Sequence, residues 1–172
     1  NVLILANHGL VVGEETVEKA EELHNEIISR LCKNTRLQEI PNIKELNLIL
    51  DKIPNSRLPK YPIIHSLATD QTSFKRAQNN SPFPDHLVFC GRKPLILNES
   101  YDIKQNIYGL VEGVGVVLFD CSTIATEEML MAQAEVFLRI PAKKNINFLS
   151  DKNCDEILNL ESEKYRKNLF LK

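Results

Sequence analysis

The chain has 172 residues, of which 43% are hydrophobic and 26% charged, as in a globular protein of one domain or two small packed units. Its formal net charge of -2 gives no electrostatic basis for binding nucleic acid or an anionic membrane, and we exclude both as partners. The four cysteines are scattered, and no apolar run or leader pattern predicts a membrane span or secretion. We therefore expect a cytoplasmic protein.

The N-terminal residues predict a strand, a turn, a second strand and a helix. Residues 2–6 and 10–12 are apolar runs on either side of the turn residues 7–9. Thr16 is a typical N-cap, and apolar residues then recur at helical spacing over residues 17–31. These residues are expected to form a hairpin that leads into an amphipathic helix.

The chain opens at Asn1 and enters an apolar strand at once. Such a strand needs neighbours along its edges. We therefore expect the sequence to be a piece of a longer protein, with an exposed strand edge at residues 2–6 if it folds alone.

The rest of the chain predicts alternating helices and short strands. The proline-rich stretch 54–59 is the candidate linker, and it divides the sequence into residues 1–53 and a second α/β unit over residues 58–172. Alternation of this kind predicts an α/β layered fold with a mainly antiparallel or mixed central sheet flanked by helices. The expected elements are helices at 41–50, 70–77, 126–140 and 150–169, a strand or short helix at 61–68, and strands at 86–90, 94–97 and 109–119.

The segment around residues 111–117 repeats the strand–turn–strand pattern of residues 5–12, and each is followed by an amphipathic helix. Aligning Gly9 with Gly115 places Val114 opposite His8. We hypothesise that residues 58–172 are a degenerate second copy of the first unit without this histidine, although strand–glycine–strand–helix segments are common in α/β proteins.

The strongest motif is Asn7, His8 and Gly9 between the two apolar runs, followed by the helix that starts after Thr16. This segment resembles the corresponding strand–turn–strand–helix of the class II aldolase/adducin family. The downstream part of the chain is similar, with less specific motifs, to the long members that resemble rhamnulose-phosphate aldolase/alcohol dehydrogenase proteins. The resemblance implies a class II aldolase-like fold.

In that family a divalent metal, most often zinc, is bound by two histidines of an upstream motif and by the histidine of the turn. The resemblance therefore implies that His8 is a metal ligand and that Asn7 and Gly9 lie beside the substrate. A neutral imidazole is a good zinc ligand, and a three-ligand site leaves positions open for substrate. The upstream histidines and the proton-transfer glutamate are absent from this sequence, so these residues alone are not expected to be active.

Two further groups are candidate site residues. Arg92 and Lys93 lie in a predicted turn and are candidates to bind a substrate phosphate, although turn cations are more often only solvated. Asp85 and His86 follow Pro84 and are candidates for a secondary polar site at a cleft.

The leading interpretation is part of a metal-dependent class II aldolase that cleaves a ketose phosphate to dihydroxyacetone phosphate and an aldehyde. Sugar-phosphate 4-epimerases and dehydratases of the same family use the same metal chemistry and remain alternatives. A non-catalytic, adducin-like interaction module is the alternative from another class. The expected partners are a small sugar-phosphate substrate and further copies of the protein in a homo-oligomer.

Overall fold

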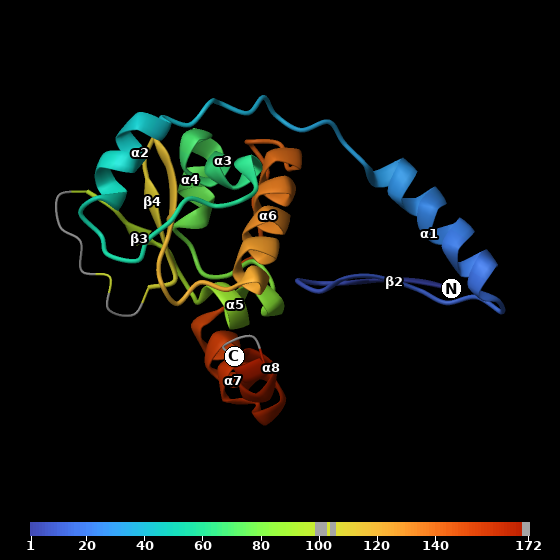
Figure 1. Ribbon diagram of the computed structural model, residues 1–172. Coiled ribbons are helices and arrows are strands. Elements are labelled where there is room, and N and C mark those ends of the chain that lie inside the picture. Colours follow the sequence, from blue (N-terminus) through green and yellow to red (C-terminus); the bar gives the residue numbers. More distant parts are fainter. Residues whose placement is uncertain (99–102, 104–105, 170–172) are drawn as a thin grey trace.

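The computed structural model describes residues 1–98, 103 and 106–169. It contains both helices and strands, and its two small sheets are flanked by helices (Figure 1). No helix among these residues is long and apolar enough to cross a membrane. In chain order the elements are β1 (Val2–Leu5), β2 (Gly9–Val12), α1 (Val17–Leu31), α2 (Ile43–Leu50), the 3-10 helix η1 (Pro62–His65), α3 (Ser66–Thr69), α4 (Gln71–Ala77), α5 (Pro84–Cys90), β3 (Leu95–Ile96), β4 (Tyr108–Val111), β5 (Gly115–Leu118), α6 (Ile124–Arg139), α7 (Asp151–Asn159) and α8 (Glu161–Leu169).

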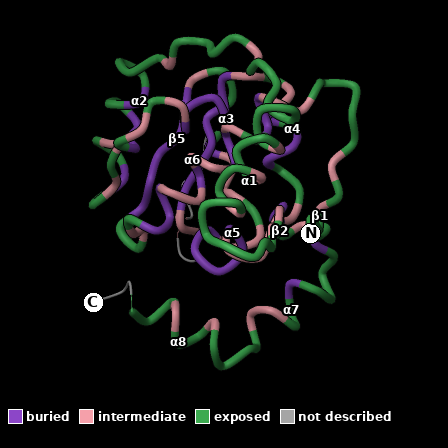
Figure 2. Tube along the Cα trace, turned by 90° about the vertical axis from the view of Figure 1, so that its right-hand side faces the viewer, coloured by how far each residue is buried: buried purple, intermediate pink, exposed green. Residues whose placement is uncertain are grey.

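Residues 1–31 form an N-terminal arm that projects from the rest of the molecule (Figure 1). Strands β1 and β2 pair as an antiparallel hairpin, and α1 begins after Thr16, whose side chain accepts a hydrogen bond from the Lys19 backbone N–H. The predicted strands, turn and helix are thus confirmed. Although both β1 and α1 carry apolar residues, β1 is exposed along its whole length and α1 buries none of its residues (Figure 2).

An extended segment, residues 32–41, joins the arm to the remainder of the chain, which we call the body. Arg36 holds this segment in place. Its backbone N–H donates to the Leu138 carbonyl at 3.0 Å, and its guanidinium donates to the Asp70 carboxylate at 2.6 Å. The half-buried ion pair fixes the segment against α4 and the end of α6.

The body is built around a three-stranded mixed sheet. Strand β3 runs parallel to β4, and β4 and β5 form an antiparallel hairpin whose strand residues are all buried. One face of the hairpin packs on α3, α5 and α6, and the other face packs on α2. The first face contributes Leu110, Val116 and Leu118 to a cluster with Ile64, Leu67 and Phe137, and the second contributes Val111 and Val117 to a cluster with Leu46 and Ile49.

Helix α2 belongs with the body rather than with the arm. Leu46 and Ile49 pack against β5, and Arg57 in the predicted linker forms a bridge with Leu118, with its N–H donating to the Leu118 carbonyl at 2.9 Å. Residues 54–59 therefore cover the edge of β5. The contacts group residues 43–53 with residues 58–169, whereas the sequence grouped them with residues 1–31.

The predicted strand at residues 86–90 is wrong, because these residues form helix α5. Pro84 occupies the first turn, where its missing N–H costs no hydrogen bond, and Gly91 ends the helix with a φ of 79°. The helix is buried over residues 86–90, so its sequence lacks the apolar–polar periodicity of a surface helix. The predicted C-terminal helix is confirmed in position but is divided at Leu160 into α7 and α8.

Candidate functional site

The tip of the arm hairpin is the turn that contains the motif identified in the sequence. Asn7 has a φ of 56° and Gly9 a φ of 129°, and the His8 N–H donates to the Leu5 carbonyl at 3.1 Å. Asparagine and glycine tolerate positive φ better than other residues, which explains their positions on either side of the histidine. The turn presents the His8 side chain at the end of the hairpin, where it is exposed.

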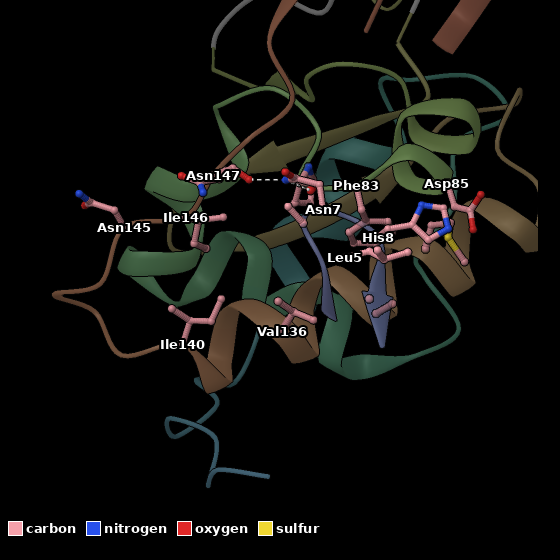
Figure 3. A pocket seen from close by; sticks show the side chains of 15 residues that line it. Leu5, Asn7, His8, Phe83, Asp85, Val136, Ile140, Asn145, Ile146 and Asn147 are labelled. Atoms are coloured by element: carbon pink, nitrogen blue, oxygen red, sulfur yellow. Dashed lines mark hydrogen bonds between the residues drawn. The ribbon is translucent and has the colours of Figure 1, made fainter. Parts of the chain in front are cut away.

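Asn7 anchors this tip to the body. Its side-chain amide donates to the Pro82 carbonyl at 2.8 Å and to the Asn147 carbonyl at 2.6 Å (Figure 3). Both carbonyls belong to loops, one before α5 and the other before α7. The motif asparagine thus shapes the turn and also fixes its position on the body.

A groove of about 680 Å³ lies between the hairpin tip and the body. Its floor is mostly apolar, and its polar groups lie at the tip, at Asp85 of α5 and in the loop that follows α6. Figure 3 shows the His8 imidazole on the side of the groove where Asp85 lies. The lining residues are Leu5–Gly9, Pro82, Phe83, Asp85, Met129, Ala132, Val136, Ile140 and Asn145–Asn147.

Asp85 lies at this groove, but its neighbour His86 does not. The Asp85 carboxylate is half-buried and accepts a hydrogen bond from Arg166 of α8 at 2.9 Å, which raises the pKa of Arg166. A further bond from Arg166 to Glu163 completes this small network. Asp85 therefore has a cationic partner already, while it still borders the groove.

His86 points into the core of the body. Its Nδ1 lies 2.8 Å from the Ser81 hydroxyl and its Nε2 lies 3.0 Å from the Gln133 side-chain oxygen. Burial lowers the pKa of His86 to about 4. The hydrogen bond with Gln133 acts in the opposite direction and is the smaller effect. Asp85 and His86 are consecutive on a helix and face different surroundings, so the structure does not bring them together as one polar site.

Arg92 and Lys93 lie away from the groove. Arg92 pairs with Asp155 and lies 3.6 Å from Asp151, both on α7. Its hydrogen bond to Asp155 raises the pKa of Arg92. Lys93 is exposed. Arg92 thus ties the turn after α5 to α7, and neither Arg92 nor Lys93 borders the groove beside His8.

The residues at the groove fit a metal only in part. His8 supplies an exposed imidazole, and Asp85 supplies a carboxylate that Arg166 already engages. Within residues 1–98, 103 and 106–169, no three His, Cys, Asp or Glu side chains come together as a metal site. A catalytic zinc site needs three protein ligands, and the described residues do not supply three beside His8.

Several groove residues were not predicted from the sequence. Asn145, Ile146 and Asn147 come from the irregular loop between α6 and α7, and Phe83 precedes α5. Loop residues carry no periodic pattern, and their proximity to His8 depends on the docking of the hairpin tip. Only the polar character of the two asparagines was available as a signal.

Replacing Asn7 with glycine tests the docking of the tip. Glycine keeps the positive φ but removes both hydrogen bonds to the body, which together contribute about 1–3 kcal/mol. We expect the equilibrium constant for docking to fall about fivefold or more and the radius of gyration from small-angle scattering to rise. Asn55→Gly is a matched control, because Asn55 also has a positive φ, of 57°, in a turn of the body. An unchanged radius of gyration in Asn7→Gly would show that these bonds do not hold the arm.

Comparison of the chain with protein-family models, with curated proteins and with solved structures finds no match.

Proposed function

We propose that this chain forms part of a metal-dependent aldolase of the class II type, in which His8 is one ligand of a divalent metal, most often zinc. The observation that carries the proposal is the position of His8. It is exposed at the tip of a hairpin, between two positive-φ residues, at the edge of a groove whose volume suits a small ligand. A histidine held in this way keeps its imidazole free to bind a metal.

The proposed reaction is the reversible cleavage of a ketose phosphate to dihydroxyacetone phosphate and an aldehyde. A bound metal would supply Lewis acidity at the substrate carbonyl. The residues of this chain would position the site: Asn7 fixes the turn, and Asn145 and Asn147 place amide groups at the same groove. The same arrangement suits a 4-epimerase or dehydratase acting on a sugar phosphate, because those reactions also begin at an activated carbonyl or carbinol.

A non-catalytic interaction module is the second candidate, and one specific observation favours it. The arm exposes a large apolar surface, with Leu3 59% and Ile4 72% exposed. Exposed apolar patches of this kind mark surfaces that bind other proteins. The two candidates differ in their need for His8, because a scaffold does not use a metal ligand.

Aldol cleavage by the native full-length protein tests the proposal. We expect ketose 1-phosphates to release dihydroxyacetone phosphate, detected by coupled NADH oxidation, and we expect a chelator to abolish the activity and zinc to restore it. His8→Ala should lower kcat/KM at least about 100-fold, as loss of a metal ligand does. His24→Ala is the matched control, because His24 is an exposed histidine on α1 of the same arm. Equal activity of His8→Ala and wild type would contradict the assignment.

A further inference from the structure

The arm hairpin and the body hairpin have the same construction. Val2 pairs with Val12 in the arm, and Tyr108 pairs with Leu118 in the body, so each residue of the arm hairpin has its counterpart 106 positions later. The positive φ values occur at equivalent places: 56° at Asn7 and 70° at Gly113, then 129° at Gly9 and 155° at Gly115. In this alignment Val114 stands where the arm has His8.

The helices that follow also correspond. Thr16 caps α1 and Thr123 caps α6, each through its side chain, and the helices are 15 and 16 residues long. Leu23 of α1 matches Leu130 of α6 when the two caps are aligned. Leu10 and Val12, the second and fourth residues of β2, are its half-buried residues, and their counterparts Val116 and Leu118 belong to the cluster that includes Leu130 and Phe137 of α6.

The two hairpins differ in how far their surroundings bury them. Val2 is 44% exposed and its counterpart Tyr108 is 1% exposed, while Val11 is 44% exposed and Val117 is fully buried. At the ends of the helices, Leu31 is 59% exposed and Leu138 is 1% exposed. The arm therefore carries the apolar positions of a buried hairpin–helix segment without the elements that bury them (Figure 2).

The body shows what covers such a segment. Strand β3 lies parallel along the outer edge of β4, with Leu95 opposite Gly109. Helix α2 covers one face through Leu46, and α3 covers the other through Leu67. At the tip, the Gly113 N–H donates to the Ala68 carbonyl at 2.9 Å. All these covering elements lie within residues 43–107.

A compensating exchange of side chains supports the correspondence. In the body, a Cβ on Gly109 would lie 2.7 Å from Leu97 and 3.0 Å from Phe119, so the glycine makes room for both side chains. The counterparts in the arm are Leu3 and Gly13, which reverse the large and small members of the pair. Paired changes that conserve volume are the ones that packed cores tolerate best.

We propose that the exposed apolar surface of the arm is a docking surface for a protein segment built like residues 43–107, which supplies a strand parallel to β1 and an apolar helix on each face. The inference does not depend on metal binding by His8. Docking would bury β1, the exposed face of β2 and the end of α1, and would pair the free hydrogen-bonding edge of β1.

A second copy of this chain is a poor occupant. Residues 43–107 of any copy already hold their own β4 and β5, so their strand edge and helix faces are taken. Pairing of two arms would bring like charges together. The side chains of residues 1–31 include six glutamates, one lysine and one arginine, which gives each arm a formal charge of -4.

A fusion protein provides the test. Residues 43–107 are placed directly before Val2 of the whole chain, which gives β1 the same spacing from the covering segment as β4 has in the body. Hydrogen exchange is then measured on the amides of β1 and β2, in the chain itself and in the fusion. We expect protection of these amides to rise about 100-fold or more in the fusion.

The matched control carries Leu46→Asp and Leu67→Asp in the added segment, which places a carboxylate where each face of the hairpin would be covered. This control fusion should give no added protection. A second fusion with Leu3→Gly removes the overlap with the added copy of Leu97, whose side chain would lie 2.7 Å from a Cβ on Gly109 in the body. The proposal is overturned if neither the first nor the second fusion protects the arm, if the control fusion protects it equally, or if sedimentation shows that the chain alone dimerises with β1 already protected.

Discussion

Arg76→Ala should lower the free energy of unfolding by about 3 kcal/mol, because one buried guanidinium holds the end of α6 and the loop after it. Its nitrogens donate to four carbonyls: Phe137 at 3.1 Å, Ile140 at 2.9 Å, and Pro141 and Lys144 at 2.8 Å each. Two of these belong to the last turn of α6 and its cap, whose carbonyls have no partner within the helix. Urea unfolding followed by circular dichroism measures the change.

Two variants sharpen this test. Arg76→Lys keeps the charge but lacks the planar set of donors of a guanidinium. We therefore expect it to lower the free energy of unfolding about half as much as Arg76→Ala does. Lys75→Ala changes the neighbouring exposed residue of α4 and should alter stability by less than about 0.5 kcal/mol. If Arg76→Ala and Lys75→Ala unfold at the same urea concentration, the four carbonyls do not depend on Arg76.

Buried His86 should make the stability of the protein fall between pH 6.5 and pH 4. Burial lowers the pKa of His86 from 6.5 to about 4, so in this window the unfolded chain binds a proton that the folded chain does not. The contribution of His86 to the free energy of unfolding is therefore fully present above pH 6.5 and is lost as the pH falls towards 4. At pH 4.5 the expected loss from this group is about 2 kcal/mol.

The contribution of His86 is isolated by comparison with variants. His86→Leu removes the titrating ring, so the stability difference between wild type and this variant should shift by about 2 kcal/mol between pH 7 and pH 4.5 in favour of the variant. His24→Leu replaces an exposed ring on α1 and serves as the control. A difference between wild type and His86→Leu that stays constant with pH would show that His86 titrates alike in the folded and unfolded chain.

The local elements with clear signals were predictable. The Thr16 cap, the turn residues 7–9 and the apolar spacing of residues 17–31 predicted the hairpin and α1 before any tertiary contact was known. Helix α5 was mistaken for a strand, because a short apolar segment buried on all sides shows neither helical nor alternating periodicity. The grouping of α2 with the body depends on the contacts of Leu46 with β5, which no local pattern encodes.

Asn7, His8, Gly9 and Asp85 were candidate site residues in the sequence, and all four line the groove. His8 was identified from its turn, but the groove beside it depends on how Asn7 reaches the carbonyls of Pro82 and Asn147. Those contacts join residues far apart in the chain. Likewise, the charge of Arg92 suggested a phosphate site, whereas its position opposite Asp155 depends on the packing of α7 on α5.

Metal content tests the central proposal, that His8 is a metal ligand, most directly. Elemental analysis of the native full-length protein should find about one zinc or other divalent ion per chain in wild type and in His24→Ala, and much less in His8→Ala. This result would assign His8 to a metal site and direct attention to ketose phosphates. Absence of bound metal from wild type after purification without chelators and reconstitution with zinc, or equal metal in His8→Ala, would contradict the proposal and favour the interaction module.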